Sequence, residues 1–147
     1  MILMVVVITP HDCVRHAQDS MISLEGCVVV VDDDASISSA LERMLQVMGY
    51  VSVIFPCAEE LLAAHTEVNA ACLILDVHLP GWSGFELYYY LARMGNAPPV
   101  IFISAHDHPE ARAKAEAAGA AAYLTKPFSG RELMAAVMQA IHARHTD

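Results

Sequence analysis

The sequence predicts a doubly wound α/β domain, with one sheet of five parallel strands covered by helices on both faces. Three observations predict this fold class. Apolar, β-rich runs alternate with segments of helical periodicity, the connections between them are short, and several of the runs are apolar at every position. A run without polar alternation suits a strand that is buried on both faces. Strands that alternate with helices pair in parallel and are joined by right-handed crossovers.

The expected elements follow one another from residue 26 onward. Segment 27–31 is a continuous apolar strand, and segment 35–48 is an amphipathic helix that Gly49 ends. The other strands are expected at 50–55, 71–75, 100–103 and 121–124, and the other helices at 58–65, 85–94, 109–118 and 131–142. No linker or internal repeat interrupts the series, so residues 26–147 are expected to form one domain.

Residues 1–25 stand apart as an N-terminal extension. Residues 1–8 are apolar, but a membrane span needs about 20 such residues. A basic n-region and a small-residue cleavage site, which would mark a signal peptide, are not visible. Pro10 would stop a strand, and Met4 and Met21 are alternative start codons. The extension is therefore a misassigned start, a loose arm, or an extra strand that pairs with a sheet edge or a second subunit.

Composition restricts the partners and the compartment. The chain has 147 residues and a formal net charge of −9, with only eight Lys and Arg, which argues against direct nucleic-acid binding through a basic face. Cys27 and Cys72 lie in strand runs and are expected to be small buried hydrophobes. No cysteine pair has the C-x-x-C spacing of a metal site. We expect a reducing compartment, the cytoplasm, and no insertion into a membrane.

Polar side chains gather where the expected strands end. Asp32 and Asp33 follow the first strand, Asp76 follows the third, Ser104 follows the fourth, and Lys126 follows the fifth. In an open parallel sheet, functional residues lie at the carboxyl ends of the strands near a topological switch point. The sequence therefore predicts that three carboxylates, a hydroxyl and an ammonium group meet at one rim.

These groups are suited to phosphoryl transfer. Clustered carboxylates repel one another and resist full ionisation unless a cation is present. Mg²⁺ suits a site with few carboxylates, several waters and a phosphate oxygen. A carboxylate can also act as a nucleophile and form an aspartyl-phosphate. We expect Asp76 to be this nucleophile, with Mg²⁺ and Lys126 neutralising the phosphoryl oxygens and Ser104 donating a hydrogen bond to one of them.

Four stretches together resemble the receiver domain of two-component response regulators. They are Val-Val-Val-Asp32-Asp33-Asp34, Leu-Ile-Leu-Asp76-Val-His-Leu-Pro80-Gly-Trp-Ser-Gly84, Ile-Phe-Ile-Ser104-Ala105 and Tyr123-Leu-Thr-Lys126-Pro127-Phe128. Their order and spacing are specific, and the resemblance covers about four fifths of the chain. It implies a flavodoxin-like fold with strand order 2-1-3-4-5 and five helices.

The resemblance also implies a role for each matching position. Asp76 is the phosphoacceptor, and Asp32 and Asp33 are the acidic pair, with Asp33 the more direct Mg²⁺ ligand and Mn²⁺ a substitute ion. The backbone carbonyl of His78 is the remaining protein ligand. Ser104 and Lys126 bind the phosphoryl group. The other implied roles are those of Tyr123, the aromatic that reports the switch, Gly84, which lets the loop after Asp76 turn, and Pro127, which follows a cis bond.

The function implied is a signalling switch rather than an enzyme, apart from its own phosphorylation and dephosphorylation. The phosphodonor is a sensor histidine kinase or a histidine phosphotransfer protein. The face made by the helix at 109–118, the strand at 121–124 and the last helix then changes shape for a downstream protein target. No output domain follows, so a stand-alone regulator is expected, although a piece of a longer regulator would look the same. The alternative is an assembly module that is independent of phosphorylation and uses residues 1–25.

Two departures from the family pattern carry hypotheses. His78 and His106 lie two residues after Asp76 and Ser104, at positions that flank the phosphoryl group. They could tune dephosphorylation and make it depend on pH near neutrality, or be plain exposed loop histidines. Tyr89 and Tyr90 fall on the solvent side of their helix, opposite Leu87, and form either a surface for a partner or a homodimer or inert exposed aromatics.

Overall fold

The computed structural model describes residues 24–64, 68–95 and 97–145, with side chains to residue 142. The strands are β1 (Val28–Val31), β2 (Ser52–Phe55), β3 (Cys72–Asp76), β4 (Val100–Ser104) and β5 (Ala122–Thr125). The helices are α2 (Ala35–Val47), α3 (Ala58–Ala64), α4 (Gly84–Arg93), α5 (Pro109–Ala117) and α6 (Gly130–His145). The expected N-terminal extension, residues 1–25, lies outside the described residues except for Leu24 and Glu25.

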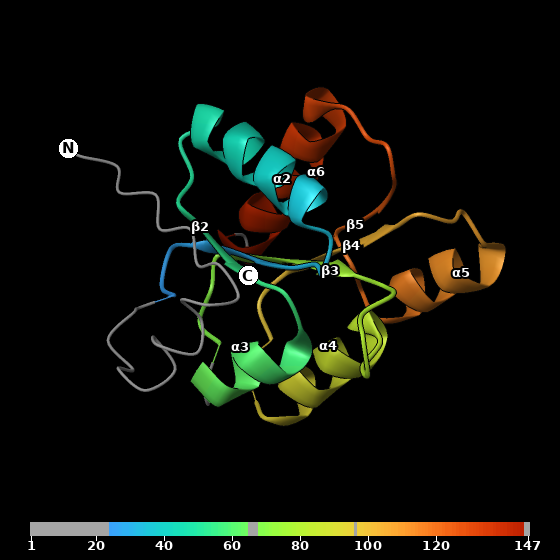
Figure 1. Cartoon of the computed structure of the whole chain (residues 1–147). Coiled ribbons are helices and arrows are strands. Elements are labelled where there is room, and N and C mark those ends of the chain that lie inside the picture. Colours follow the sequence, from blue (N-terminus) through green and yellow to red (C-terminus); the bar gives the residue numbers. More distant parts are fainter. Residues whose placement is uncertain (1–23, 65–67, 96, 146–147) are drawn as a thin grey trace.

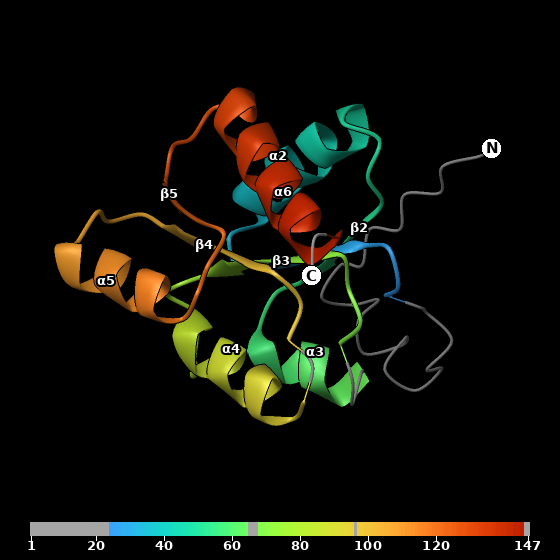
Figure 2. The same ribbon diagram turned by 180° about the vertical axis from the view of Figure 1, so that it is seen from behind.

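The strands form one parallel sheet in the order β2-β1-β3-β4-β5. Helices α2 and α6 cover one face of the sheet, and α3, α4 and α5 cover the other (Figures 1 and 2). Both the fold class and the strand order agree with the sequence prediction. Strand order reverses between β1 and β3, so a crevice forms at the carboxyl ends of these two strands, where an open α/β sheet places its ligand site.

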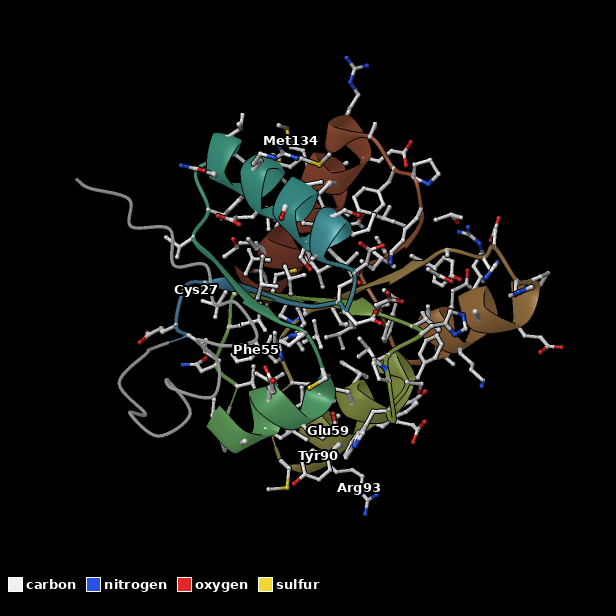
Figure 3. All side chains as sticks on the ribbon, viewed as in Figure 1. Cys27, Phe55, Glu59, Tyr90, Arg93 and Met134 are labelled. Carbon is white, nitrogen blue, oxygen red and sulfur yellow. The ribbon has the colours of Figure 1, made fainter. Side chains whose placement is uncertain are left out.

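The core consists of two apolar layers, one on each face of the sheet. Val29 and Leu73 pack toward α3 and α4, while Val28 and Ile74 pack toward α2 and α6. Phe55, labelled in Figure 3, belongs to the layer on the α3 side. All four side chains of β1 are fully buried, which explains why its sequence is a continuous apolar run instead of an alternating one. Leu24 is also buried in this core.

Two strands differ in burial from what their sequences suggest. The expected strand at 50–55 alternates, yet all of β2 is buried, including Ser52, whose hydroxyl has no hydrogen-bond partner among the described residues. All four residues of β5 are only partly buried, whereas β2, the other edge strand of the sheet, is buried at every position. The element limits otherwise lie within a few residues of the prediction, with the largest difference at the end of α6, which continues to His145.

No helix in the described part of the chain combines the length and the apolar character that a bilayer crossing requires.

Candidate functional site

The parallel sheet brings the predicted polar residues to one rim. Asp76 is the last residue of β3 and Ser104 is the last residue of β4. Asp32 directly follows β1 and Lys126 directly follows β5. Backbone hydrogen bonds fix this rim, since Asp32 N donates to Phe55 O at 3.1 Å and Lys126 N donates to Ser104 O at 2.7 Å. The strand register, not a local motif, therefore places these groups together.

Asp32, Asp33 and Asp76 form an acidic triad. One carboxylate oxygen from each lies within 4.8 Å of the others. Asp32 is 2% exposed and Asp76 is 5% exposed, while Asp33 is exposed. Two carboxylates are thus held at the bottom of the site, and the third faces the solvent from which a cation would arrive.

Lys126 joins the two buried carboxylates. Its Nζ donates a hydrogen bond to Asp76 Oδ2 at 2.8 Å and lies 3.0 Å from Asp32 Oδ2. Burial acts to lower the pKa of Lys126, but contact with Asp76 and Asp32 outweighs it and raises this pKa above its ordinary value. Lys126 therefore stays charged and is a fixed positive group opposite the triad.

The surroundings of Asp32 disfavour the ionised form of its carboxylate. Burial, with a smaller contribution from the charge of Asp76, raises the pKa of Asp32 to about 6, although the Asp34 amide and Lys126 act in the opposite direction. Asp32 Oδ1 accepts a hydrogen bond from Asp34 N at 2.9 Å. Asp32 Oδ2 is buried and is ion-paired with Lys126 Nζ at 3.0 Å, but this contact lacks hydrogen-bond geometry. An under-satisfied buried carboxylate oxygen beside two further carboxylates is a donor set suited to a hard divalent cation.

The loop after β3 is shaped by Asp76 itself. Asp76 Oδ1 accepts a hydrogen bond from His78 N at 2.8 Å, and His78 pairs with Ser83 in an isolated antiparallel bridge. A Cβ on Gly84 would collide with the Asp76 carbonyl oxygen and would lie 3.0 Å from its carbonyl carbon. Gly84 does not have a positive φ. The glycine is thus required by the close approach of the loop to Asp76, and not by a turn conformation.

The hydroxyl groups of Ser104 and Tyr123 donate hydrogen bonds to the same backbone oxygen. Ser104 is fully buried, and its hydroxyl donates to His106 O at 2.9 Å and accepts from His106 N at 3.1 Å. The Tyr123 hydroxyl donates to the same His106 O at 2.9 Å. The Ser104 hydroxyl is therefore turned toward the β4–α5 loop. The sequence could not reveal this link, because a backbone carbonyl acceptor leaves no residue signature.

Arg112 is a further residue at this site that the sequence prediction missed. Its guanidinium pairs with Asp107 Oδ1 at 3.0 Å, and its Cζ lies 4.8 Å from the centre of the Tyr123 ring. Arg112 thus connects the β4–α5 loop to the exposed side of Tyr123. The only sequence signal was the acidic residue Asp107 just before the helix, and acidic residues are common at helix starts.

The two loop histidines lie close together, and the two tyrosines of α4 are exposed. The rings of His78 and His106 are neighbours, with centroids 6.0 Å apart. Tyr89 and Tyr90 are 45% and 40% exposed, and Tyr90 is seen on the outer side of α4 in Figure 3. The Lys126–Pro127 bond is cis, as predicted.

Cys27 and Cys72 are buried, as predicted. Burial raises the pKa of Cys72 to about 12, which keeps its thiol protonated.

Comparison with known proteins agrees with this geometry. The sequence model of the response regulator receiver domain family matches residues 28–138 of this chain. Nodulation protein W of Bradyrhizobium diazoefficiens is 37% identical over 118 residues, which is 80% of this chain and 52% of that protein. Response regulator protein TmoT of Ectopseudomonas mendocina is 35% identical over 127 residues, 86% of this chain and 56% of that protein. The chain thus spans about half the length of the curated relatives that it matches.

A solved structure shows the same fold. The CheY-like receiver domain from Methanospirillum hungatei superposes with a TM-score of 0.74 at 26% identity, covering 84% of this chain and 98% of that one. The match of the family model, the acidic triad and the Lys126 contact are together typical of two-component signalling. Receiver domains are signalling modules rather than classical enzymes, and this chain belongs to the response regulator receiver domain family.

Proposed function

We propose that the chain is a phosphorylation switch in which Asp76 accepts a phosphoryl group. Mg²⁺, or Mn²⁺ in its place, would be held by Asp32, Asp33, Asp76 and the backbone carbonyl of His78. When bound, the cation supplies positive charge against the carboxylates and the phosphoryl oxygens. The observation that carries the proposal is the contact of Lys126 Nζ with Asp76 Oδ2 at 2.8 Å, beside an acidic triad within 4.8 Å.

The reaction exchanges one bond to phosphorus for another. A carboxylate oxygen of Asp76 forms a bond to the phosphorus of a phosphohistidine, and the N–P bond of the donor breaks, with the electron pair leaving on the imidazole. Hydrolysis restores the free carboxylate of Asp76, because water attacks the phosphorus, the Asp76 O–P bond breaks and inorganic phosphate leaves. Lys126 keeps its charge throughout and offsets the negative charge of the transferred group.

The switch follows from the hydrogen bonds of Ser104 and Tyr123. A phosphoryl group on Asp76 offers acceptor oxygens that compete with His106 O for the Ser104 hydroxyl. When Ser104 turns toward Asp76, the β4–α5 loop loses one of the contacts that hold it, and Tyr123 can leave the same carbonyl. The face formed by α5, β5 and α6 then changes for partner binding.

Receiver domains interact with histidine kinases. For this chain we propose a sensor histidine kinase or a histidine phosphotransfer protein as donor, a downstream protein as target, and the cytoplasm as location. We also propose that residues 26–147 act as a stand-alone receiver and that residues 1–25 are an extension to it. The alternative, an assembly module that works through residues 1–25 without phosphorylation, predicts no chemistry at Asp76.

Mass spectrometry after treatment with a small phosphodonor and Mg²⁺ tests the proposal. Wild type should gain one phosphoryl group, Asp76→Ala should gain none, and Glu116→Ala, which changes an exposed carboxylate on α5, should behave as wild type. The DrrB receiver domain of Thermotoga maritima, which is described as BeF3 activated, has a TM-score of 0.69 at 30% identity over 80% of this chain and 98% of that one. BeF3⁻ with Mg²⁺ is therefore a second probe. Absence of any adduct in wild type would favour the assembly module.

We propose that His78 and His106 tune the lifetime of the phosphorylated state. Their rings stand 6.0 Å apart on the two loops that border Asp76 and Ser104, where they can restrict the approach of water. The half-life of the phosphoryl group, measured from pH 6 to pH 8 in wild type and in His106→Ala, tests this role. Identical half-lives at every pH would rule it out.

We propose that Tyr89 and Tyr90 form a surface for a protein partner or a second copy of the chain. Both are exposed, and Tyr90 stacks edge-on against Trp82 at 5.6 Å, in the loop next to the acidic triad. Replacing both tyrosines by serine should weaken association without altering phosphorylation. Unchanged oligomeric state and unchanged binding of a phosphorylated donor would show that the surface is inert.

A further inference from the structure

Three histidine rings border the mouth of the acidic site. His78 lies in the β3–α4 loop, while His106 and His108 lie in the β4–α5 loop. The ring centroids of His78 and His106 are 6.0 Å apart, and those of His106 and His108 are 5.6 Å apart. His106 is thus the shared member of two close imidazole pairs, one between the loops and one within a single loop.

The imidazole rings are free to bind a ligand, while hydrogen bonds hold the backbone of the loops that carry them. All three residues are exposed, and the structure gives none of their imidazoles a hydrogen-bond partner among the described residues. His108 occupies the N-cap position of α5 without making a capping hydrogen bond. In contrast, His78 N is bound to Asp76, and the carbonyl of His106 is bound to Ser104 and Tyr123. The main chain holds the histidines at the mouth and leaves their nitrogens uncommitted.

The spacing is that of imidazoles able to share one metal ion. With Zn–N bonds of about 2.0–2.1 Å, two imidazoles on one tetrahedral Zn²⁺ place their ring centres about 5 Å apart. The two observed separations exceed this value by little. As the side chains stand, the three histidines do not bring three ligand atoms together as the acidic triad does, so binding requires the exposed side chains to rotate. Imidazole suits Zn²⁺, whereas carboxylates and water suit Mg²⁺, so the histidine cluster and the acidic triad select different ions.

We propose that His106, together with His78 and His108, forms a second metal site that binds Zn²⁺ at the mouth of the acidic pocket. An ion there would lie on the path by which a phosphodonor or water reaches Asp76, and would slow both gain and loss of the phosphoryl group. This consequence rests on the proposed role of Asp76, while the binding of Zn²⁺ does not.

Calorimetric titration of the full chain with Zn²⁺, in excess Mg²⁺ to occupy the acidic triad, tests the site. His106→Ala should weaken binding by about tenfold or more, since even an outer partner of a metal ligand is worth that much. His78→Ala and His108→Ala should each weaken it less. His142→Ala, which removes an exposed histidine on α6, is the matched control and should leave this binding event unchanged. Equal affinities in wild type and His106→Ala would overturn the proposal.

Two further readouts separate this proposal from the proposed function. The ¹⁵N resonances of the ring nitrogens of His78, His106 and His108 should shift when Zn²⁺ is added, and a shift confined to other histidines would also overturn the site. Asp76→Ala should still bind Zn²⁺ although it forms no adduct. In wild type, Zn²⁺ should slow adduct formation, and in His106→Ala it should not. Bound Zn²⁺ without any effect on the rate would refute the slowing of phosphoryl transfer.

Discussion

At the scale of single residues, Asp32 shows how the site lowers the stability of the folded protein. Its carboxylate is 2% exposed, it lies within 4.8 Å of two other carboxylates, and one of its oxygens accepts no hydrogen bond within the described chain. Burial raises its pKa from 3.8 to about 6. Lys126 offsets only part of this penalty. Without a bound metal ion, the ionised form of Asp32 therefore lowers the stability of the folded state, and a bound divalent ion relieves this loss.

The sign of this effect gives a pH prediction. Between the unfolded pKa of 3.8 and the folded pKa of about 6, the folded state holds more protons than the unfolded state, so stability falls as pH rises through this window. In EDTA, Asp32→Asn should therefore melt at a higher temperature than wild type at pH 7.5, and the gap should shrink below pH 6 and vanish near pH 4. Thermal unfolding followed by circular dichroism measures it. A gap that stays constant with pH would contradict the raised pKa.

Gly84 is the second residue whose role is set by close packing. An Ala at this position would drive its Cβ into the Asp76 carbonyl, and the atoms that it would meet belong to the backbone and cannot rotate away. Gly84→Ala should lower the free energy of unfolding by about 1–3 kcal/mol and disturb the geometry of Asp76.

Gly130→Ala is the matched control for this prediction. Gly130 is also the first residue of a helix, has no positive φ, and has nothing within 4 Å of its Cβ position. Urea unfolding of both variants should show a loss for Gly84→Ala and none for Gly130→Ala. Equal stabilities would mean that the loop can move away from Asp76 without penalty.

At the scale of elements, the start of α4 shows how a local signal supports the site. Ser83 Oγ accepts from Glu86 N at 3.0 Å and Glu86 Oε1 accepts from Ser83 N at 3.2 Å, which is a complete capping box. This cap fixes the end of the loop that carries His78 and the start of α4 at Gly84. Ser83→Ala should lower stability by about 1 kcal/mol, and urea unfolding checks this. Ser39→Ala, on the exposed side of α2, should have no such cost, and a similar loss in both variants would discount the cap.

The elements also show which parts of the structure could be predicted from the sequence. Strands β1, β3 and β4 were predictable because burial on both faces demands apolar residues at every position. The rim residues were predictable because parallel strands end at a common edge. The burial of Ser52 was not, because a polar residue in a short strand suggests a solvent face. The shared acceptor at His106 O and the Arg112–Tyr123 contact depend on side-chain rotamers and on spatial neighbours far apart in sequence.

At the scale of the whole molecule, the site exists only while the sheet is intact. Lys126 and Asp76 are 50 residues apart in the sequence, and they meet because β5 pairs with β4 and β4 pairs with β3. In the unfolded chain Asp32 and Asp33 are still neighbours, but Asp76 is not held beside them. A divalent ion should therefore bind the folded state more tightly than the unfolded one, which makes ion binding a contribution to the stability of the entire domain.

This coupling predicts that Mg²⁺ stabilises the protein. At a concentration about 100 times its Kd, an ion that binds only the folded state adds about 2.7 kcal/mol, which corresponds to a rise in Tm of roughly 10 °C for a domain of this size. Asp33→Asn should abolish most of this rise, because Asp33 is the exposed member of the triad and its replacement leaves both contacts of Lys126 in place. NaCl at equal ionic strength controls for screening of the net charge of −9. If Mg²⁺ raised the Tm of wild type and Asp33→Asn equally, the ion would be acting on the general surface charge and the triad would not be its site.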